Sequence, residues 1–137
     1  MIRHKPGQYL TFWLEIPGHP PVKRNYSISD APNGQTYRIS VKREPMGLAS
    51  GWLHDHARAG TVLKVAPPAG EFFLDDQPQR PVVLLSGGVG LTPMVSMLET
   101  IAASHPATNV HFAHGTLDGS THAMGPHIHA LIAKHGN

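Results

Sequence analysis

One short segment, residues 24–29 with the sequence RNYSIS, places a cation, an aromatic ring and hydroxyl groups on neighbouring positions. The Arg24 guanidinium could neutralise a diphosphate as a forked, charge-assisted donor. The Tyr26 ring could lie flat against another ring system, and the Ser27 hydroxyl could bond to a ring nitrogen. Taken alone, the segment fits a solvated edge strand better, so the interpretation depends on its neighbours.

A second segment, residues 86–93 with the sequence SGGVGLTP, joins an apolar run to a helix-like stretch. Glycine lets a backbone approach a phosphate closely, and the positive end of a following helix attracts the anion. The glycines, at 87, 88 and 90, fit neither G-x-G-x-x-G nor a Walker A loop. A turn that merely packs helix on strand remains the alternative.

The eleven histidines suggest a metal site as a rival hypothesis. Side chains at i and i+2 point apart on a helix, and no pair has a third ligand specified nearby, so surface or packing roles are expected. A serine hydrolase is also disfavoured, because Ser86 precedes the glycines rather than standing between them. Met94 and Met97, like Trp13 and Trp52, are interpreted as packing residues. The close histidine pairs are His54 with His56, His111 with His114, and His127 with His129.

These segments need strands and helices to position them, and the first half predicts antiparallel sheet. In residues 8–16 the apolar side chains alternate with polar ones, which is typical of a strand with one buried face. Residues 36–43 repeat the alternation after an Asn-Gly pair that favours a tight turn. Further strands are expected within residues 60–65 and 71–74. Residues 1–76 are therefore predicted to form a small antiparallel barrel.

The second half changes period. Residues 81–86 form a continuous apolar run, typical of a parallel strand buried on both faces. The next stretch predicts a helix with Thr92 as its N-cap and Pro93 at its first position. A second strand over 109–115 and a second helix over 126–136 complete a strand–helix–strand–helix order. Residues 81–137 thus predict part of a doubly wound α/β domain, after a polar connector at 75–80.

Composition narrows the classes of function. The 137-residue chain has a formal net charge of +2 and no basic run interleaved with aromatics, which argues against nucleic acid as a partner. It has no cysteine, which excludes disulfides, cysteine-ligated clusters and thiolate zinc sites. No apolar run of about 18 residues and no signal-peptide core occurs, so no membrane partner and a cytoplasmic location are expected.

The motifs together carry a resemblance that none carries alone. In chain order they are GQY at 7–9, RNYS at 24–27, VKRE with SGWLHDH between 41 and 56, and GGVGLTPM at 87–94. With these motifs the sequence resembles, over essentially its whole length, the reductase part of a flavohaemoglobin, within the ferredoxin–NADP reductase-like flavoproteins.

The resemblance implies two cofactor sites. Tyr26 would stack on the isoalloxazine of FAD and Ser27 would lie near its N5 atom, which makes these two the implied catalytic residues. Arg24 would hold the diphosphate, and Tyr9 would contact the flavin or its adenosine. The implied flavin contacts are Tyr9, Arg24, Asn25, Tyr26, Ser27, Lys42, Glu44 and Ser50. The implied contacts to the phosphates of NAD(P)H are Gly88, Val89, Gly90, Leu91, Thr92 and Pro93.

The resemblance also implies a reaction: hydride passes from NAD(P)H to flavin N5, and electrons pass on to the haem of a separate globin domain or to another acceptor. No globin segment is present. Relative to the family, we expect this chain to lack the first strand of the barrel and the later strands of the nucleotide domain. The alternative is a non-catalytic fragment that binds flavin or nucleotide weakly and needs a partner chain. Unpaired sheet edges would then favour self-association. The sequence does not distinguish NADH from NADPH.

Overall fold

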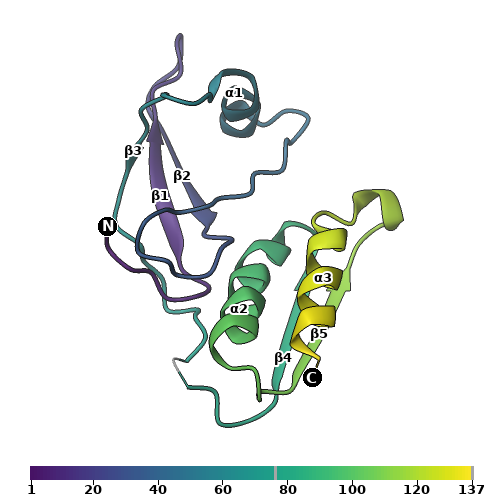
Figure 1. The fold of residues 1–137 in the computed structure, drawn as a ribbon. Helices are drawn as coiled ribbons and strands as arrows, with labels where there is room; N and C mark the ends of the chain where they lie inside the picture. Colours follow the sequence, from purple (N-terminus) through teal and green to yellow (C-terminus); the bar gives the residue numbers. More distant parts are fainter. Residues whose placement is uncertain (76, 137) are drawn as a thin grey trace.

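The fold comes from a computed structural model that describes residues 1–75 and 77–136. Figure 1 shows two parts: an antiparallel sheet with one short helix, and a parallel strand pair with two longer helices. Asp76, at the predicted domain boundary, and Asn137, at the chain end, lie outside the described residues. Within those residues, no helix is both long and apolar enough to cross a membrane.

The first part is built around strand β1, Tyr9–Leu14, which lies between β2, Val22–Ser27, and the two-residue β3, Lys64–Val65. Both pairings are antiparallel. The predicted alternation in β1 is confirmed, because every second side chain is buried in one apolar cluster. The members of that cluster in and just after β1 are Leu10, Phe12, Leu14 and Ile16.

Two predicted strands of this part are wrong. Residues 36–43 contribute only an isolated bridge between Ile28 and Ile39, and residues 71–74 contribute none in the described chain. The alternation at 36–43 reflects burial rather than a ladder, since every second side chain still packs on the core. The Arg38 N–H bonds to the Asp30 carboxylate at 3.1 Å instead of to a neighbouring strand. The antiparallel unit is therefore an open barrel.

Helix α1, Leu48–His56, follows a turn that the sequence analysis did not identify as a helix start. A Cβ at Gly47 would lie 2.4 Å from Ser50 Oγ and 2.9 Å from the Glu44 Cβ, so a side chain there would have to displace these neighbours. The helix buries Ala49 and Leu53 against the β1 cluster. It thereby closes one end of the open barrel.

The second part confirms the predicted strand–helix–strand–helix order. Strand β4, Val82–Gly87, pairs in parallel with β5, Val110–Gly115, and helix α2, Leu91–Ser104, connects them. Helix α3, Gly125–His135, follows β5 and contacts α2. Short 3₁₀ turns, Gly88–Gly90 and Gly119–Thr121, precede α2 and α3 respectively.

The prediction that strand β4 is buried on both faces is wrong. Leu84 is buried under the helices, whereas Val83 and Leu85 are 67% and 69% exposed. The reason is that α2 and α3 cover the same face of the strand pair (Figure 1), and their side chains form one cluster with Leu84. The other face of the two strands is open in the described structure.

The predicted N-cap of α2 is also wrong. The helix begins at Leu91 with Gly90 as its cap residue, so Thr92 lies inside the first turn and its Oγ1 donates to the Val89 carbonyl at 3.3 Å. Pro93 is the third helical residue, and it is tolerated because N–H groups of the first turn have no partner within the helix. The glycine-rich turn therefore leads directly into the helix.

The two parts pack against each other through α2. The Ser96 hydroxyl, fully buried, donates to the Asp30 carbonyl at 2.7 Å. Gly7 has φ +108°, and a Cβ there would lie 2.5 Å from Met97 Cε. This close approach fixes the N-terminal end of the barrel against the helix, which brings the glycine-rich turn near the loop that follows residue 38.

Candidate functional site

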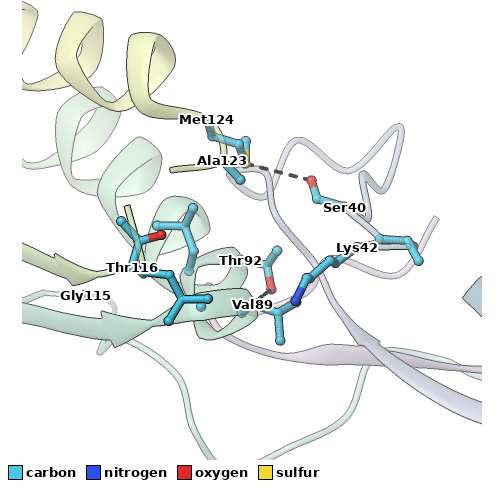
Figure 2. A pocket seen from close by; sticks show the side chains of 12 residues that line it. Ser40, Lys42, Val89, Thr92, Gly115, Thr116, Ala123 and Met124 are labelled. Carbon is cyan, nitrogen blue, oxygen red and sulfur yellow. Dashed lines mark hydrogen bonds between the residues drawn. The ribbon is translucent and has the colours of Figure 1, made fainter. Parts of the chain in front are cut away.

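A cavity of about 670 Å³ lies where the two parts meet, at the carboxyl ends of β4 and β5. The last residues of the two strands, Gly87 and Gly115, are paired directly. Ligands of open α/β sheets bind in the crevice outside these strand ends. Figure 2 shows side chains from both parts around this space. The lining residues are Ser40, Val41, Lys42, Gly88, Val89, Leu91, Thr92, Gly115, Thr116, Leu117, Ala123 and Met124.

Four of the six predicted nucleotide residues line the cavity: Gly88, Val89, Leu91 and Thr92. Gly88 has φ +51°, a left-handed conformation that favours glycine, and a Cβ there would meet no atom within 4 Å. Because Leu91 and Thr92 open α2, the positive end of the helix borders the cavity. Gly90 and Pro93 belong to the same turn but are not among the lining residues.

Lys42 is the charged side chain among the lining residues of this cavity. It comes from the first part of the chain, and Figure 2 shows it reaching toward the turn that carries Val89. Its Nζ lies 3.3 Å from the Glu44 carboxylate, and both side chains are more than half exposed. The resemblance implied that Lys42 approaches the flavin diphosphate; in the structure Lys42 lines the cavity beside the glycine-rich turn.

Several lining residues were missed by the sequence analysis. Gly115, Thr116 and Leu117 follow β5, so the rule that ligands bind at strand ends could have found them. Ser40 and Met124 carry no such signal, because long-range packing brings them together. The Ser40 hydroxyl donates to the Met124 sulfur at 3.9 Å, and Met124 has a left-handed φ of 57°.

The predicted flavin segment lies on β2, and its residues are not among those that line this cavity. The Arg24 side chain is exposed, and its Nη1 donates to the Lys23 carbonyl at 2.7 Å. Tyr26 is half-buried, with its ring edge-on to Phe12 at 5.7 Å between centroids. Burial raises the pKa of Tyr26, and the charge of Arg24 offsets only part of that rise, so the phenol stays protonated at neutral pH.

Strand geometry divides this segment between two faces. Arg24 and Tyr26 share one face, while Asn25 and Ser27 share the other, because side chains alternate along a strand. Tyr9 is paired with Ser27, and a Cβ on Gly70 would lie 2.9 Å from the Tyr9 ring. The side chains of this segment, a guanidinium, phenol rings and hydroxyls, have the chemistry to contact a coenzyme with an anionic and an aromatic portion.

Ser50 and Glu44 do not meet Arg24 in the described contacts. The buried Ser50 hydroxyl accepts from the Glu44 N–H at 3.1 Å and donates to the Gly47 carbonyl at 3.3 Å, so it holds the turn before α1. Glu44 lines a second cavity of about 540 Å³ beside α1. A two-point ion pair at 2.5 and 3.0 Å, Arg43 with Asp55, borders the same cavity.

In each predicted histidine pair, at least one member contacts another residue of the fold. His54 bonds to the Val41 carbonyl at 2.8 Å, and His56 stacks on Trp52 with centroids 5.6 Å apart. His127 bonds to Glu99 at 2.7 Å. His114 Nδ1 lies 2.9 Å from Ser86 Oγ, from paired positions of β5 and β4. Over residues 1–75 and 77–136, no group of three candidate ligands is arranged to hold a metal ion.

Comparison with known proteins identifies relatives over almost the whole chain. Residues 84–137 match the oxidoreductase NAD-binding domain family. Flavohemoproteins of Xylella fastidiosa 9a5c and Bacillus cereus ATCC 10987 are 55% and 48% identical over 98% and 92% of this chain. These alignments cover 34% and 33% of those relatives, so the chain spans about a third of their length.

Solved structures that resemble this chain are also reductases or FAD/NAD-binding domains. The flavohem-like FAD/NAD-binding domain of nitric oxide dioxygenase from Vibrio cholerae has a TM-score of 0.93 and 37% identity, covering 99% of this chain and 59% of its own. A cytochrome P450 reductase from Amycolatopsis has a TM-score of 0.84 and 28% identity, with 98% and 41% coverage. Over almost its whole length the chain is therefore similar to the reductase part of flavohemoproteins, and its second part matches an oxidoreductase NAD-binding family.

Proposed function

We propose that the chain is the NAD(P)H-dependent flavin reductase portion of a flavohaemoglobin-like nitric oxide dioxygenase. Residues 1–76 hold FAD, and residues 81–137 hold the nicotinamide nucleotide. The observation that carries this proposal is the cavity at the carboxyl ends of β4 and β5, which residues of both parts line. A nucleotide bound there lies beside the antiparallel part, as transfer between two cofactors requires.

The nucleotide is held by charge and close backbone approach. The glycine-rich turn at 88–90 lets phosphate oxygens approach the main chain, and the start of α2 adds its positive end. Lys42 supplies a full positive charge from the opposite wall. Its ion pair with Glu44 is exposed, so exchanging that partner for a phosphate costs little free energy.

The flavin is held along β2. Arg24 binds the diphosphate, Tyr26 supplies a flat aromatic surface, and Ser27 donates from its hydroxyl. Asn25, whose amide oxygen accepts from the Thr11 hydroxyl at 2.9 Å, keeps the strand in register beside these groups. When bound, FAD supplies the redox chemistry, since it takes two electrons and a proton from NAD(P)H and can release the electrons singly.

The electron acceptor is proposed from the relatives. The flavohemoproteins that match this chain are about three times as long, and their name includes haem. The partner of this chain in electron transfer is therefore a haem-globin domain. We place the reaction in the cytoplasm, for which a chain without cysteine is suited. The nicotinamide nucleotide is NADH or NADPH, and both are included in the test.

A second candidate is a non-catalytic flavin- or nucleotide-binding unit that a partner chain completes. The observation that favours it is the uncovered face of β4 and β5, where Val83 and Leu85 are exposed. Exposed apolar side chains of this size on one face often mark a contact with further protein. This candidate would bind cofactor without passing electrons.

Anaerobic reduction separates the two. The purified chain is loaded with FAD, freed of excess cofactor, and mixed with NADH or NADPH while the flavin absorption is followed. Bleaching supports the reductase. If the chain retains FAD, and dithionite bleaches that FAD while NADH and NADPH do not, the result supports the non-catalytic binding unit. Lys42→Met should slow bleaching at low nucleotide concentration, whereas Lys134→Met, at an exposed position of α3, should not.

A further inference from the structure

We infer that Glu99, on α2, is a positioning residue that fixes the distance between the two walls of the nucleotide cavity. This inference rests on the proposed function of that cavity. One wall is residues 40–42, and the other is Ala123 and Met124, which directly precede α3. Glu99 itself does not line the cavity.

The Glu99 carboxylate is held from three directions. Its Oε2 accepts from the Ala31 N–H at 2.9 Å, and its Oε1 accepts from Arg38 Nη2 at 2.5 Å and from His127 Nε2 at 2.7 Å. The carboxylate side chain is only 14% exposed. Burial raises the pKa of Glu99, but the hydrogen bonds from Arg38, His127 and Ala31 outweigh it and hold the pKa below its ordinary value.

The first wall is connected to Glu99 through Arg38. Arg38 also donates to the Ser29 carbonyl, and the Ser29 N–H donates to the Arg38 carbonyl at 2.7 Å. The fully buried Ser29 places its hydroxyl 3.0 Å from that of Ser40. Because Ser40 and Lys42 are two residues apart on this loop, holding Arg38 also holds the Lys42 cation at the cavity.

The second wall is connected through His127. This histidine lies three residues after Met124, the residue that caps α3 in a left-handed conformation. The two walls touch each other where the Ser40 hydroxyl meets the Met124 sulfur at 3.9 Å. One carboxylate on α2 therefore anchors both walls. The start of the same helix supplies two further lining residues of the cavity, Leu91 and Thr92.

Glu99→Gln is the sharpest variant, because the amide has nearly the same shape as the carboxylate. Its two ends are an oxygen and an NH₂ group, so one end must present hydrogens to groups that are themselves donors. The side that loses its hydrogen bond, toward Ala31 or toward Arg38 and His127, is then free to move. The groups that line the cavity are unchanged, so an effect on nucleotide binding reports position.

The test uses the FAD-loaded chain and a tetrahydro analogue of NADH, which cannot reduce the flavin. We expect Glu99→Gln to weaken binding of the analogue about tenfold, the effect of losing one charged hydrogen bond, with FAD affinity unchanged. Amide hydrogen exchange should become faster in residues 38–42 and in 123–128. Glu71→Gln, at an exposed position, is the matched control and should change neither.

His127→Asn, which cannot span the distance to Glu99, is the second variant should Glu99→Gln not fold. This variant should weaken binding of the analogue, and it should speed amide hydrogen exchange only in residues 123–128. Equal analogue affinity in wild type and a folded variant would overturn the inference while leaving the proposed function standing. A wild-type chain that retains FAD but does not bind the analogue would overturn the proposed function itself, and this inference with it.

Discussion

Arg24 and Tyr26 share one face of β2, opposite Phe12 and Leu10 of β1. The two side chains start about 7 Å apart along the strand, twice its rise per residue. Ser27, the last residue of the strand, faces the other way. Groups on both faces can reach one planar coenzyme only at the strand's open edge. The flavin is therefore expected to lie along the outer edge of β2, where the described sheet has no further strand.

Tyr26→Ala should weaken FAD binding more than Tyr37→Ala. Both rings pack on the same apolar cluster, so both variants lose core contacts, but only Tyr26 is placed to stack on the flavin. A lost aromatic stack costs about 1 kcal/mol, or roughly fivefold in affinity. Equilibrium titration of the apo chain with FAD measures it, and equal losses in the two variants would count against the assignment.

Arg24→Gln should weaken FAD binding by about tenfold, because one charged hydrogen bond to the diphosphate is lost. Riboflavin, which has no phosphate, should bind the variant and the wild type equally. Fluorescence titration with both ligands isolates the diphosphate contact within one pair of proteins. A similar loss for riboflavin would show that Arg24 acts on the strand and not on the phosphates.

The local patterns in the sequence predicted the parts of the site that one segment forms alone. The alternation around Phe12 and the glycines at 87–90 are properties of neighbouring residues, and both produced the expected elements. The wall at 40–42 could not be foreseen, because residues 36–43 have strand periodicity without a strand partner. Its position depends on Asp30 and Glu99, which are distant in sequence and carry no local signal.

The same limit explains the error at β4. A continuous apolar run predicts burial on both faces only if both faces meet further protein. In the described structure the helices cover the Leu84 side, and Val83 and Leu85 remain exposed. Periodicity reports what a strand can bury, and the tertiary partners decide which face is covered.

Gly88→Ala should destabilise the fold, whereas Gly90→Ala should not. A Cβ at either position meets no atom within 4 Å, so the difference is conformational. Gly88 has φ +51°, which costs a residue with a side chain about 1 kcal/mol, whereas Gly90 has φ −62°. Urea unfolding measures the free energies. Of the two glycines, Gly88 lines the cavity, so Gly88→Ala should also weaken nucleotide binding. Equal unfolding free energies for the two variants would exclude the left-handed conformation at Gly88.

The fold should lose stability in mild acid through His4. This side chain is 3% exposed, and its Nε2 donates to the Asp30 carbonyl at 3.1 Å. Burial holds the pKa of His4 below 6.5, with the bond to Asp30 opposing the shift only in part. The unfolded chain therefore takes up the proton first, so the contribution is complete above about pH 6.5 and declines as the pH falls toward the folded pKa.

His4→Gln should flatten this part of the pH profile. Gln can still donate to the Asp30 carbonyl but does not titrate, so unfolding free energy should fall less between about pH 7.5 and about pH 5.5 than in the wild type. The difference in slope is at most about 1.4 kcal/mol per pH unit, the limit for one proton. His19→Gln, at an exposed position, is the control, since it removes a histidine without removing a buried one. Urea unfolding at each pH measures the slopes, and parallel profiles for His4→Gln and the wild type would show that His4 titrates alike in the folded and unfolded chain.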